Sequence, residues 1–270
     1  GFVNIIGNPN VGKSTLMNAL VGEKLSIITS KAQTTRHRIM GIVSSEDFQI
    51  VYSDTPGILK PSYKLQESMM KFVTGAVADA DVILYVTDTV ERGERSAEII
   101  DRIRQSGVPA IVVINKIDLS TPEALDALVD KWRQELPEAQ IVPASAKENF
   151  NIEGLFKTIL ALLPEGPAFY PKETLTDKTL RFFASEIIRE KILKFYDKEI
   201  PYCCEIEIES YKEEPTIDRI SATIYVARDS QKGILIGHKG EKLKKVGQTA
   251  REDMEQFLGK KVFLQLFVKV

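Results

Sequence analysis

The sequence predicts an α/β fold in two parts: a doubly wound domain with a mainly parallel sheet, and a smaller α+β domain after it. Three observations support this. The chain has 270 residues, roughly the length of two domains. Short apolar runs alternate with longer amphipathic stretches in its first part, as in successive β–α–β units. This alternation stops at a segment from Pro164 to Pro171 that holds three prolines and a glycine, which indicates a linker.

The first domain, drawn at residues 1–165, contains five apolar runs that we expect to be strands. They lie at residues 2–6, 49–52, 82–87, 110–114 and 140–142. Continuous runs of this kind are typical of parallel strands buried on both faces. Helical spacing of apolar residues appears at 13–21, 64–78, 94–106, 121–136 and 151–163. Thr121 and Pro122 make a clear helix start, because a capping hydroxyl precedes a proline of the first turn.

The second domain follows a linker at residues 166–175 and is drawn at 176–270. Its expected order is helix, strand, strand, helix, helix, strand. The ranges are 177–196, 204–209, 220–226, 229–235, 241–258 and 262–270. Apolar and acidic side chains alternate in the first of these strands, so that Cys204 faces a core while Glu205 faces solvent. This order differs from that of the first domain and predicts an α+β arrangement.

Charge and cysteine content exclude several classes of protein. The 36 Lys and Arg against 38 Asp and Glu exclude a uniformly basic protein and a disordered acidic one. The charge is nevertheless segregated, with 17 basic and 21 acidic side chains in the first 170 residues and 19 and 17 in the last hundred. Two adjacent cysteines and two histidines provide neither a disulfide framework nor a zinc-site spacing. We therefore expect a cytoplasmic setting, and no apolar run approaches the ~18 residues of a membrane span.

A phosphate-binding loop is predicted between the first strand and the first helix. Gly7 and Gly12 let the backbone curl until its N–H groups point at phosphate oxygens, and the helix N-terminus adds partial positive charge. Lys13 can bridge the β- and γ-phosphates, and the Ser14 hydroxyl can bind Mg²⁺. An ordinary glycine-rich turn is the alternative, disfavoured by the position between strand and helix. The expected nucleotide contacts here are Asn8, Pro9, Asn10, Val11, Gly12, Lys13, Ser14 and Thr15.

Two short motifs after later strands favour guanine over adenine. Asp118 can accept hydrogen bonds from guanine N1–H and the exocyclic amine, a donor pair that adenine lacks. Asn115 is expected to hold the loop and the purine N7 edge, and the aliphatic stem of Lys116 to cover the base. A backbone N–H for guanine O6 is expected from the run Ser145, Ala146 and Lys147.

Two further loops are expected to sense the γ-phosphate. Asp54 ends a strand and would hold Mg²⁺ through water, while the N–H of Gly57 would contact the γ-phosphate. One threonine of the polar loop at residues 30–38 should bind Mg²⁺ only when the γ-phosphate is present, and we favour Thr35 over Thr34. Loops that are ordered by the γ-phosphate and released on hydrolysis are the switches of GTPases.

These motifs resemble those of the translation-factor-related GTPases. In many of those relatives a glutamine follows the glycine of the Asp-x-x-Gly motif and orients the attacking water. Here Ile58 stands in that place, so we expect slow intrinsic turnover. Relatives with this change and an asparagine at the position of Asn10 resemble potassium-dependent GTPases, which implies K⁺ near the β/γ bridge; a loop-capping role for Asn10 is the alternative. The candidate catalytic residues are Lys13, Asn10, Thr35 and Gly57, and the candidate metal ligands are Ser14, Thr35, Asp54 and Asn10.

A glycine turn in the second domain is a candidate for nucleic-acid binding. Gly237 and Gly240 flank a polar pair between two helices, where they let a nucleic-acid backbone approach closely. Residues 232–245 hold five lysines and one acid, although a solvated lysine-rich helix face is the alternative. The expected RNA contacts are Ile236, Gly237, His238, Lys239, Gly240, Lys242, Lys244 and Lys245.

The order of elements in the second domain resembles the type II KH domain. A P-loop GTPase domain followed by such a domain resembles the Era-type GTPases of bacterial ribosome assembly, and residues 31–38 and 185–191 share that resemblance. It implies GTP or GDP with Mg²⁺ as cofactors. It also implies binding of single-stranded RNA near the 3′ end of small-subunit ribosomal RNA and a part in maturing the small ribosomal subunit. We expect a monomer, with weak peripheral contact to the inner membrane left open.

Other functions remain as alternatives. The chain could be a GTPase scaffold or regulator in tRNA modification or cell-cycle control rather than in ribosome assembly. The guanine motifs disfavour a P-loop kinase, and the KH-like part lacks the catalytic carboxylates or thiols expected of a modification enzyme.

Overall fold

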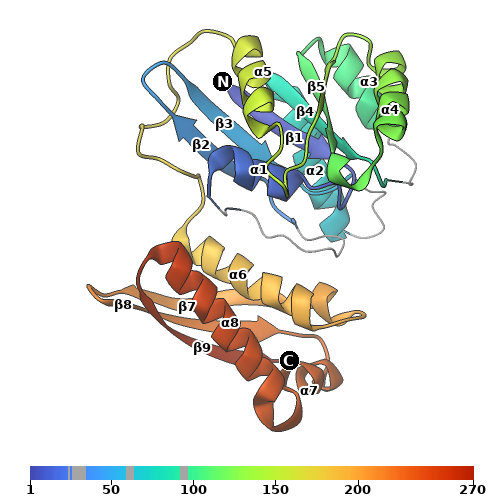
Figure 1. Ribbon diagram of the computed structural model, residues 1–270. Coiled ribbons are helices and arrows are strands. Elements are labelled where there is room, and N and C mark those ends of the chain that lie inside the picture. Colours follow the sequence, from blue (N-terminus) through green and yellow to red (C-terminus); the bar gives the residue numbers. More distant parts are fainter. Residues whose placement is uncertain (24, 26–34, 59–63, 92–96) are drawn as a thin grey trace. The chain divides into compact units, whose positions relative to one another are not determined.

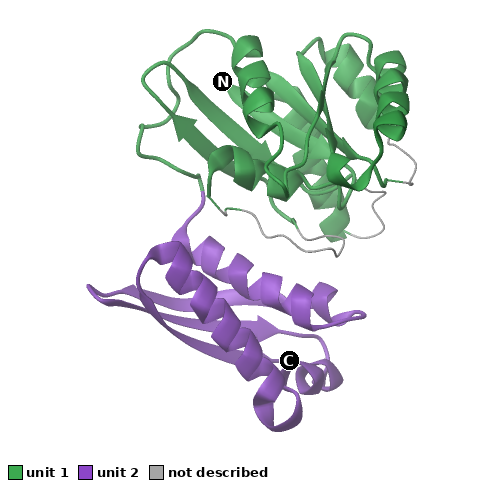
Figure 2. Cartoon of the chain, viewed as in Figure 1, with its two compact units in different colours: residues 1–177 green, residues 178–270 purple. Residues whose placement is uncertain are grey.

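The chain divides into two compact units, residues 1–177 and 178–270 (Figure 2). A computed structural model describes all residues except 24, 26–34, 59–63 and 92–96. Residues 166–175, which the sequence predicts as a linker, belong to the first unit. The Gln49 side chain accepts hydrogen bonds from the N–H groups of Phe169 and Tyr170, at 2.8 and 3.1 Å. The Ile42 N–H donates to the Leu175 carbonyl at 2.8 Å. These bonds explain why a proline-rich segment lies along the edge of the first unit.

The first unit is built on a six-stranded sheet in the order β2-β3-β1-β4-β5-β6 (Figure 1). Its strands are β1 (Phe2–Gly7), β2 (Ile39–Ser44), β3 (Gln49–Asp54), β4 (Val82–Asp88), β5 (Ala110–Asn115) and β6 (Gln140–Pro143). β2 runs antiparallel to β3, and the other neighbours are parallel. Every residue of β3 and β4 is buried, which confirms the prediction of a mainly parallel sheet covered on both faces.

The sequence pattern does not predict β2, and the structure supplies the reason. Gly41 interrupts the apolar run in the middle of this strand, and glycine weakens a strand signal. A Cβ atom at Gly41 would lie 2.6 Å from Val21 Cγ2 and 2.9 Å from Met17 Cε. The glycine therefore permits the close approach of the helix that carries the phosphate loop.

Helices cover both faces of this sheet. α1 (Lys13–Val21) and α5 (Ile152–Leu162) contact each other on one side. α2 (Lys64–Ala78), α3 (Ala97–Ser106) and α4 (Pro122–Glu135) share one hydrophobic cluster with the sheet. Trp132 of α4 is fully buried, with its ring centroid 5.2 Å from that of Tyr85 on β4, so its side chain packs α4 against the sheet. Residues 94–96 of the predicted third helix lie outside the described residues.

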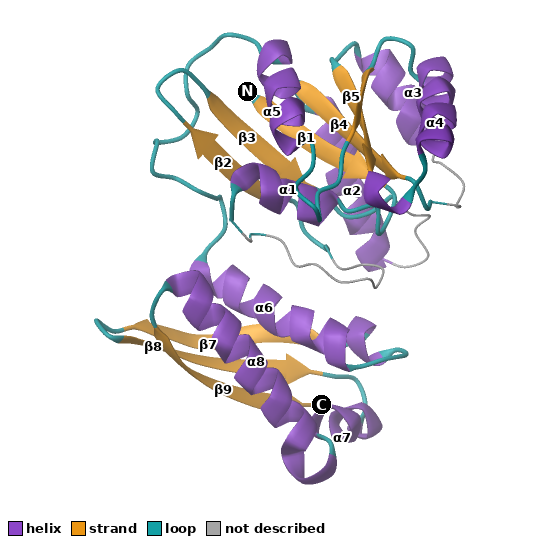
Figure 3. Ribbon diagram, in the orientation of Figure 1, coloured by secondary structure: helices purple, strands orange, loops and turns teal. Residues whose placement is uncertain are grey.

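The second unit is a three-stranded sheet with helices on one face (Figure 3). Its helices are α6 (Leu180–Phe195), α7 (Asp229–Ile236) and α8 (Glu241–Leu258), and its strands are β7 (Glu205–Glu213), β8 (Ile217–Tyr225) and β9 (Lys261–Lys269). β7 is antiparallel to β8, and β9 is parallel to β8. Cys204 and Ile208 are buried while Glu205 is exposed, which confirms the predicted alternation. In the described part of the chain, none of the helices combines the length and the apolar character needed to cross a membrane.

Candidate functional site

The predicted nucleotide motifs meet at one edge of the first sheet. The phosphate loop follows β1, Asp54 ends β3, Asn115 ends β5, and Ser145 follows β6. These strands are parallel, so their carboxyl ends lie at the same edge, which is where open α/β sheets bind ligands.

Gly7 and Gly12 occupy two positions around the loop between β1 and α1 where a larger residue would not fit. Gly12 has a φ of +95°, in the left-handed region that favours glycine. A Cβ atom at Gly12 would lie 2.2 Å from Asn115 Nδ2, and one at Gly7 would lie 2.3 Å from the Val86 carbonyl oxygen. The left-handed backbone at Gly12 curves the loop, and the two glycines let it pack closely against its neighbours. A loop curved in this way can direct several backbone N–H groups towards one anion.

Lys13, the first residue of α1, is buried, and its Nζ donates to the Asn8 carbonyl oxygen at 2.7 Å. Burial lowers the pKa of Lys13 to about 8. The carboxylates of Asp54 and Glu91 act against that shift, whereas Lys116 adds to it. An ammonium group in this state gains from any anion placed beside it.

Three predicted metal ligands from different segments lie together. Ser14 Oγ donates to Asp54 Oδ2 at 2.7 Å, and it lies 3.0 Å from Thr35 Oγ1. Asp54 is fully buried and Thr35 is buried. Thr34, the alternative to Thr35, lies outside the described residues. Two hydroxyls and a carboxylate form an all-oxygen set, which fits Mg²⁺.

Asn10, the fourth candidate ligand, lies apart from this set. It is exposed and has a φ of +63°. Its carbonyl oxygen accepts a hydrogen bond from Lys116 Nζ. Within the described ranges, the Asn10 side chain takes part in none of the hydrogen bonds among Ser14, Thr35 and Asp54.

Asn115 joins the phosphate loop to the guanine loops. Its Nδ2 donates to the Val11 carbonyl at 2.9 Å, and its Oδ1 accepts from the Ala146 N–H at 3.0 Å. An amide nitrogen carries two hydrogens, so one remains for a purine N7. The loop-holding part of its predicted role is thus visible in these two bonds.

Asp118 and its neighbours present polar groups beside that junction. Ser145 Oγ donates to Asp118 Oδ1 at 2.8 Å. Asp118 itself is exposed, as is Lys147. Lys116 forms an ion pair with Asp88, at 2.8 Å between Nζ and Oδ2. The side chain of Lys116 is therefore anchored between Asp88 and the phosphate loop.

Two carboxylates lie at the site although the sequence analysis does not predict them as site residues. Asp88 ends β4 and accepts at Oδ1 from the N–H groups of Val90 and Glu91, at 3.0 and 2.6 Å. Glu91 accepts from Asn8 Nδ2 and, at 2.7 Å, from the Thr87 hydroxyl. A signal for Asp88 existed, because it ends a strand in the same way as Asp54. Glu91 follows no recognisable motif.

Gly57 and Ile58 lie against the phosphate loop. A Cβ atom at Gly57 would lie 2.8 Å from Pro9 Cγ, and the Ile58 N–H donates to the Gly7 carbonyl at 3.0 Å. The Ile58 side chain is buried in the cluster that includes α2 and α3. It is therefore part of the core and carries no group that could orient a water molecule.

The turn between α7 and α8 has the left-handed backbone expected of its glycines. Gly237 and Gly240 have φ of +74° and +76°. His238 and Lys239 between them are exposed, and so is Ile234 at 43%. Ile236 packs instead against the core of the second unit. The lysines that follow on α8 are all exposed: Lys242, Lys244 and Lys245.

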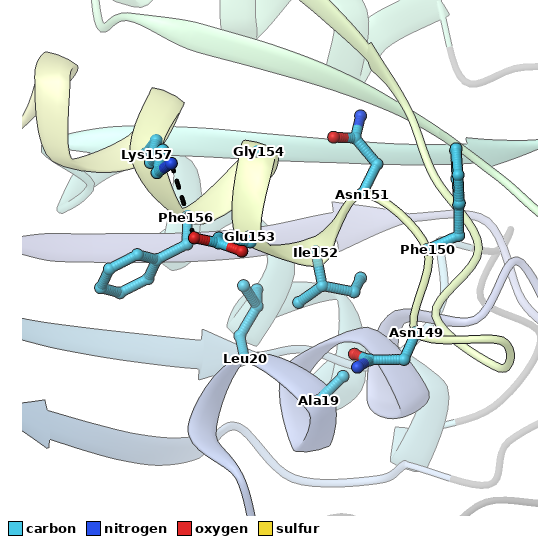
Figure 4. A pocket seen from close by; sticks show the side chains of 10 residues that line it. All are labelled: Ala19, Leu20, Asn149, Phe150, Asn151, Ile152, Glu153, Gly154, Phe156 and Lys157. Carbon is cyan, nitrogen blue, oxygen red and sulfur yellow. Dashed lines mark ion pairs between the residues drawn. The ribbon is translucent and has the colours of Figure 1, made fainter.

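A separate cavity of about 650 Å³ lies between the end of α1 and the start of α5 (Figure 4). Leu20, Ile152 and Phe156 give it apolar walls. Lys157 and Glu153 at its rim form an ion pair of 3.5 Å. None of the predicted nucleotide contacts lines it, so it is distinct from the loops described above.

Comparisons with known proteins agree with the GTPase motifs of the first unit and with the KH-like order of elements in the second. Residues 2–116 match the 50S ribosome-binding GTPase family, and residues 199–270 match the KH domain family. GTPase Era of Alkaliphilus metalliredigens is 45% identical over 273 residues, covering 100% of this chain and 92% of that protein. GTPase Era of Staphylococcus haemolyticus is 44% identical over 272 residues, covering 100% and 91%.

Solved structures of Era have the same fold over the whole chain. A crystal structure of Era in complex with MgGDPNP and nucleotides 1506–1542 of 16S ribosomal RNA has a TM-score of 0.95 and 41% identity, covering 100% of this chain and 93% of that one. Aquifex aeolicus Era bound to GDP and AlF₄⁻, as a single-residue variant, has a TM-score of 0.94 at the same identity and coverage. Because the relatives match over the full length and both units carry the expected motifs, the chain belongs to the Era family and is a GTPase.

Proposed function

We propose that this GTPase is a molecular switch that binds single-stranded RNA near the 3′ end of small-subunit ribosomal RNA and assists maturation of the small ribosomal subunit. One observation carries the proposal. A guanine-nucleotide site on the first unit is joined in one chain to a glycine turn flanked by exposed lysines on the second. The Era structure that contains nucleotides 1506–1542 of 16S ribosomal RNA supports the same RNA as the target here.

GTP and GDP with Mg²⁺ are the proposed cofactors. Ser14, Asp54 and Thr35 would hold the ion, because their oxygens lie together and suit a hard cation. Mg²⁺ would supply charge compensation for the β- and γ-phosphates. Thr35 would complete the set only while its loop is drawn in, and the Gly57 N–H would contact the γ-phosphate. Loss of that phosphate would release both loops.

The proposed hydrolysis depends on electrostatics more than on proton transfer. Lys13 and the N–H groups of the phosphate loop would stabilise the charge that develops on the phosphate oxygens. The residue directly after Gly57 is Ile58, whose apolar, buried side chain cannot orient the attacking water. Because Ile58 stands where many related GTPases have a water-orienting glutamine, we expect slow intrinsic GTP hydrolysis.

K⁺ is part of the proposal through Asn10. Its side chain is exposed at the tip of the phosphate loop, where an amide oxygen could bind a cation near the β/γ bridge. We expect faster GTP hydrolysis in KCl than in NaCl at equal ionic strength, and the loss of this difference in Asn10→Ala. Equal rates in the two salts would remove K⁺ from the proposal.

The proposed RNA contacts are the turn and the lysines that follow it. The left-handed turn keeps side chains away from an approaching RNA backbone. The contacts are Ile236, Gly237, His238, Lys239, Gly240, Lys242, Lys244 and Lys245. A monomeric state and a cytoplasmic setting remain predictions from the sequence.

Crosslinking to total bacterial RNA with GTP and then with GDP tests the proposal. We expect enrichment of the 3′ end of small-subunit ribosomal RNA, stronger with GTP. Enrichment of tRNA instead would favour a role in tRNA modification. No enrichment of any RNA would refute RNA binding and leave only the GTPase.

A further inference from the structure

Two aromatic side chains lie beneath lysines of the proposed RNA site. Lys245 Nζ is 4.4 Å from the ring centroid of Phe195, and Lys242 Nζ is 5.6 Å from that of Tyr196. Phe195 ends α6 and Tyr196 follows it, while both lysines lie in the first two turns of α8. An ammonium group within ~6 Å of a ring centroid is attracted by the ring's quadrupole.

The Tyr196 ring is fixed in place. It is buried in the core of the second unit, and its hydroxyl donates to the Leu235 carbonyl oxygen at 2.6 Å. Burial raises the pKa of Tyr196 to about 12, so the hydroxyl remains a neutral donor at ordinary pH. Leu235 lies two residues before Gly237, which ties the ring directly to the glycine turn.

Lys242 is held from a second side by Gly237. A Cβ atom at Gly237 would lie 2.7 Å from Lys242 Cγ and 2.8 Å from its Cβ. The stem of the lysine therefore packs against the glycine backbone while its ammonium group lies over Tyr196. Gly237 serves the position of this lysine as well as the shape of the turn.

The rings hold these lysines without neutralising them. Among the described residues, neither Lys242 nor Lys245 has a carboxylate within ion-pair distance. Lys191 shows the contrasting case, since it pairs with Glu190 and Asp253. A carboxylate would fix a lysine but cancel its charge, whereas an aromatic ring limits its motion and leaves the charge for a phosphate.

We propose that Phe195 and Tyr196 are positioning residues of the RNA site, which hold the ammonium groups of Lys245 and Lys242 where RNA phosphates arrive. The proposal rests on the proposed RNA-binding function. Holding a lysine in advance reduces the conformational freedom that is lost on binding. Removal of one ring should therefore weaken RNA binding through its lysine alone.

A double-mutant cycle in the full chain tests this coupling. The probe is labelled RNA of nucleotides 1506–1542 of 16S ribosomal RNA, and the variants are Phe195→Leu, Lys245→Gln and both together. We expect Phe195→Leu to raise Kd about 2- to 5-fold, the range of an exposed cation–π contact. In the Lys245→Gln background the same change should have no further effect. Lys245→Gln should also reduce the slope of log Kd against log salt by about 1, whereas Phe195→Leu should not.

Two controls separate positioning from general structure. Phe195→Tyr keeps an aromatic face and should restore wild-type affinity. Phe263 makes a similar contact elsewhere in the second unit, because its ring centroid lies 5.6 Å from Cζ of Arg219 on β8. Phe263→Leu removes that ring and should leave RNA affinity unchanged. Thermal unfolding of each variant checks that the second unit is folded.

The outcomes distinguish this proposal from the proposed function. If Phe195→Leu weakens binding equally with and without Lys245, the ring acts by another route and the proposal is wrong although RNA binding stands. If Phe195→Tyr is as weak as Phe195→Leu, the aromatic face is not what matters, and the proposal is likewise wrong. If the unmodified chain does not bind the probe, the proposed function fails and this proposal fails with it.

Discussion

At the scale of single residues, Lys13 has an unfavourable environment that a nucleotide would relieve. Its ammonium group is buried, and its pKa is lowered to about 8 by that burial. Its Nζ donates to a backbone carbonyl of the same loop, that of Asn8. Phosphate oxygens would stabilise the charged form and raise the pKa. Nucleotide binding and protonation of Lys13 should therefore be linked.

The first prediction is proton uptake on GTP binding. At about pH 8.5 most Lys13 side chains of the free protein should be neutral, so that binding takes up most of one proton. At about pH 6.5 the lysine is already charged, and no uptake is expected from it. Titration calorimetry in two buffers of different ionisation enthalpy measures the difference. In Lys13→Arg, whose guanidinium stays charged, the uptake should vanish; absence of uptake in the unmodified chain at the higher pH would contradict the prediction.

The second prediction concerns the base. Asp118→Asn replaces an acceptor with a donor at the atoms expected to face guanine, so preference should move from GTP to XTP. Loss of two hydrogen bonds to a charged group lowers GTP affinity by about 10²- to 10⁴-fold. Competition between labelled GTP and XTP measures the change. Ser145→Ala is the matched control, because it removes only the hydroxyl that donates to Asp118 Oδ1: it should weaken GTP binding without a change of preference. Unchanged GTP preference in Asp118→Asn would refute the guanine assignment.

At the scale of elements, the sequence predicts those strands and helices whose apolar residues form a continuous or regularly repeating pattern. The buried parallel strands read as unbroken apolar runs, and each helix repeats its apolar face. β2 escapes this because Gly41 interrupts its run, and because its pairing with β3 depends on residues distant in the sequence. Residues 166–175 read as a linker because composition does not reveal that Gln49 binds their backbone. Glu91 could not be predicted from the sequence either, because it joins the site through a hydrogen bond from Asn8, which lies 83 residues away in the sequence.

The third prediction compares two glycines of the first unit. Gly41→Ala would place a Cβ atom against Val21 and Met17 of α1, and such overpacking lowers the free energy of unfolding by about 1–3 kcal/mol. Because α1 begins with Lys13, GTP affinity should also fall. Gly75→Ala in α2 has no atom within 4 Å of the new Cβ and should stabilise by about 0.5–1 kcal/mol.

Fluorescence of Trp132 measures both changes in the same unit. It is the only tryptophan of the chain, and it lies buried in the first unit, so urea unfolding followed by its emission reports that unit alone. Equal stability of the two variants would show that the space around Gly41 does not limit the side chain there.

At the scale of the whole molecule, the near balance of total charge conceals a difference between the two units in where charged residues lie and in the ligand that each is proposed to bind. The first 170 residues are net acidic, and the proposed nucleotide site depends on local features, namely loop N–H groups and one buried lysine. In the second unit, five lysines lie in residues 232–245 around the glycine turn, while four glutamates lie on β7: Glu205, Glu207, Glu209 and Glu213. Two sites on separate units should respond independently to substitutions that act locally.

The last prediction tests this independence at the glycine turn. Gly237→Asp puts a negative charge and a side chain at a φ of +74°, where the new Cβ atom would meet the Lys242 stem at 2.7 Å. RNA affinity should fall at least about tenfold, while GTP affinity stays the same. Gly259→Asp is the matched control: it has a φ of +63° with no atom within 4 Å, ends α8 away from the turn, and should bind RNA normally. Filter binding with RNA and with GTP measures both affinities. If Gly237→Asp lost GTP affinity as well, the two sites would be coupled even without a bound partner, and the separation of charge between the units would not correspond to a separation of function.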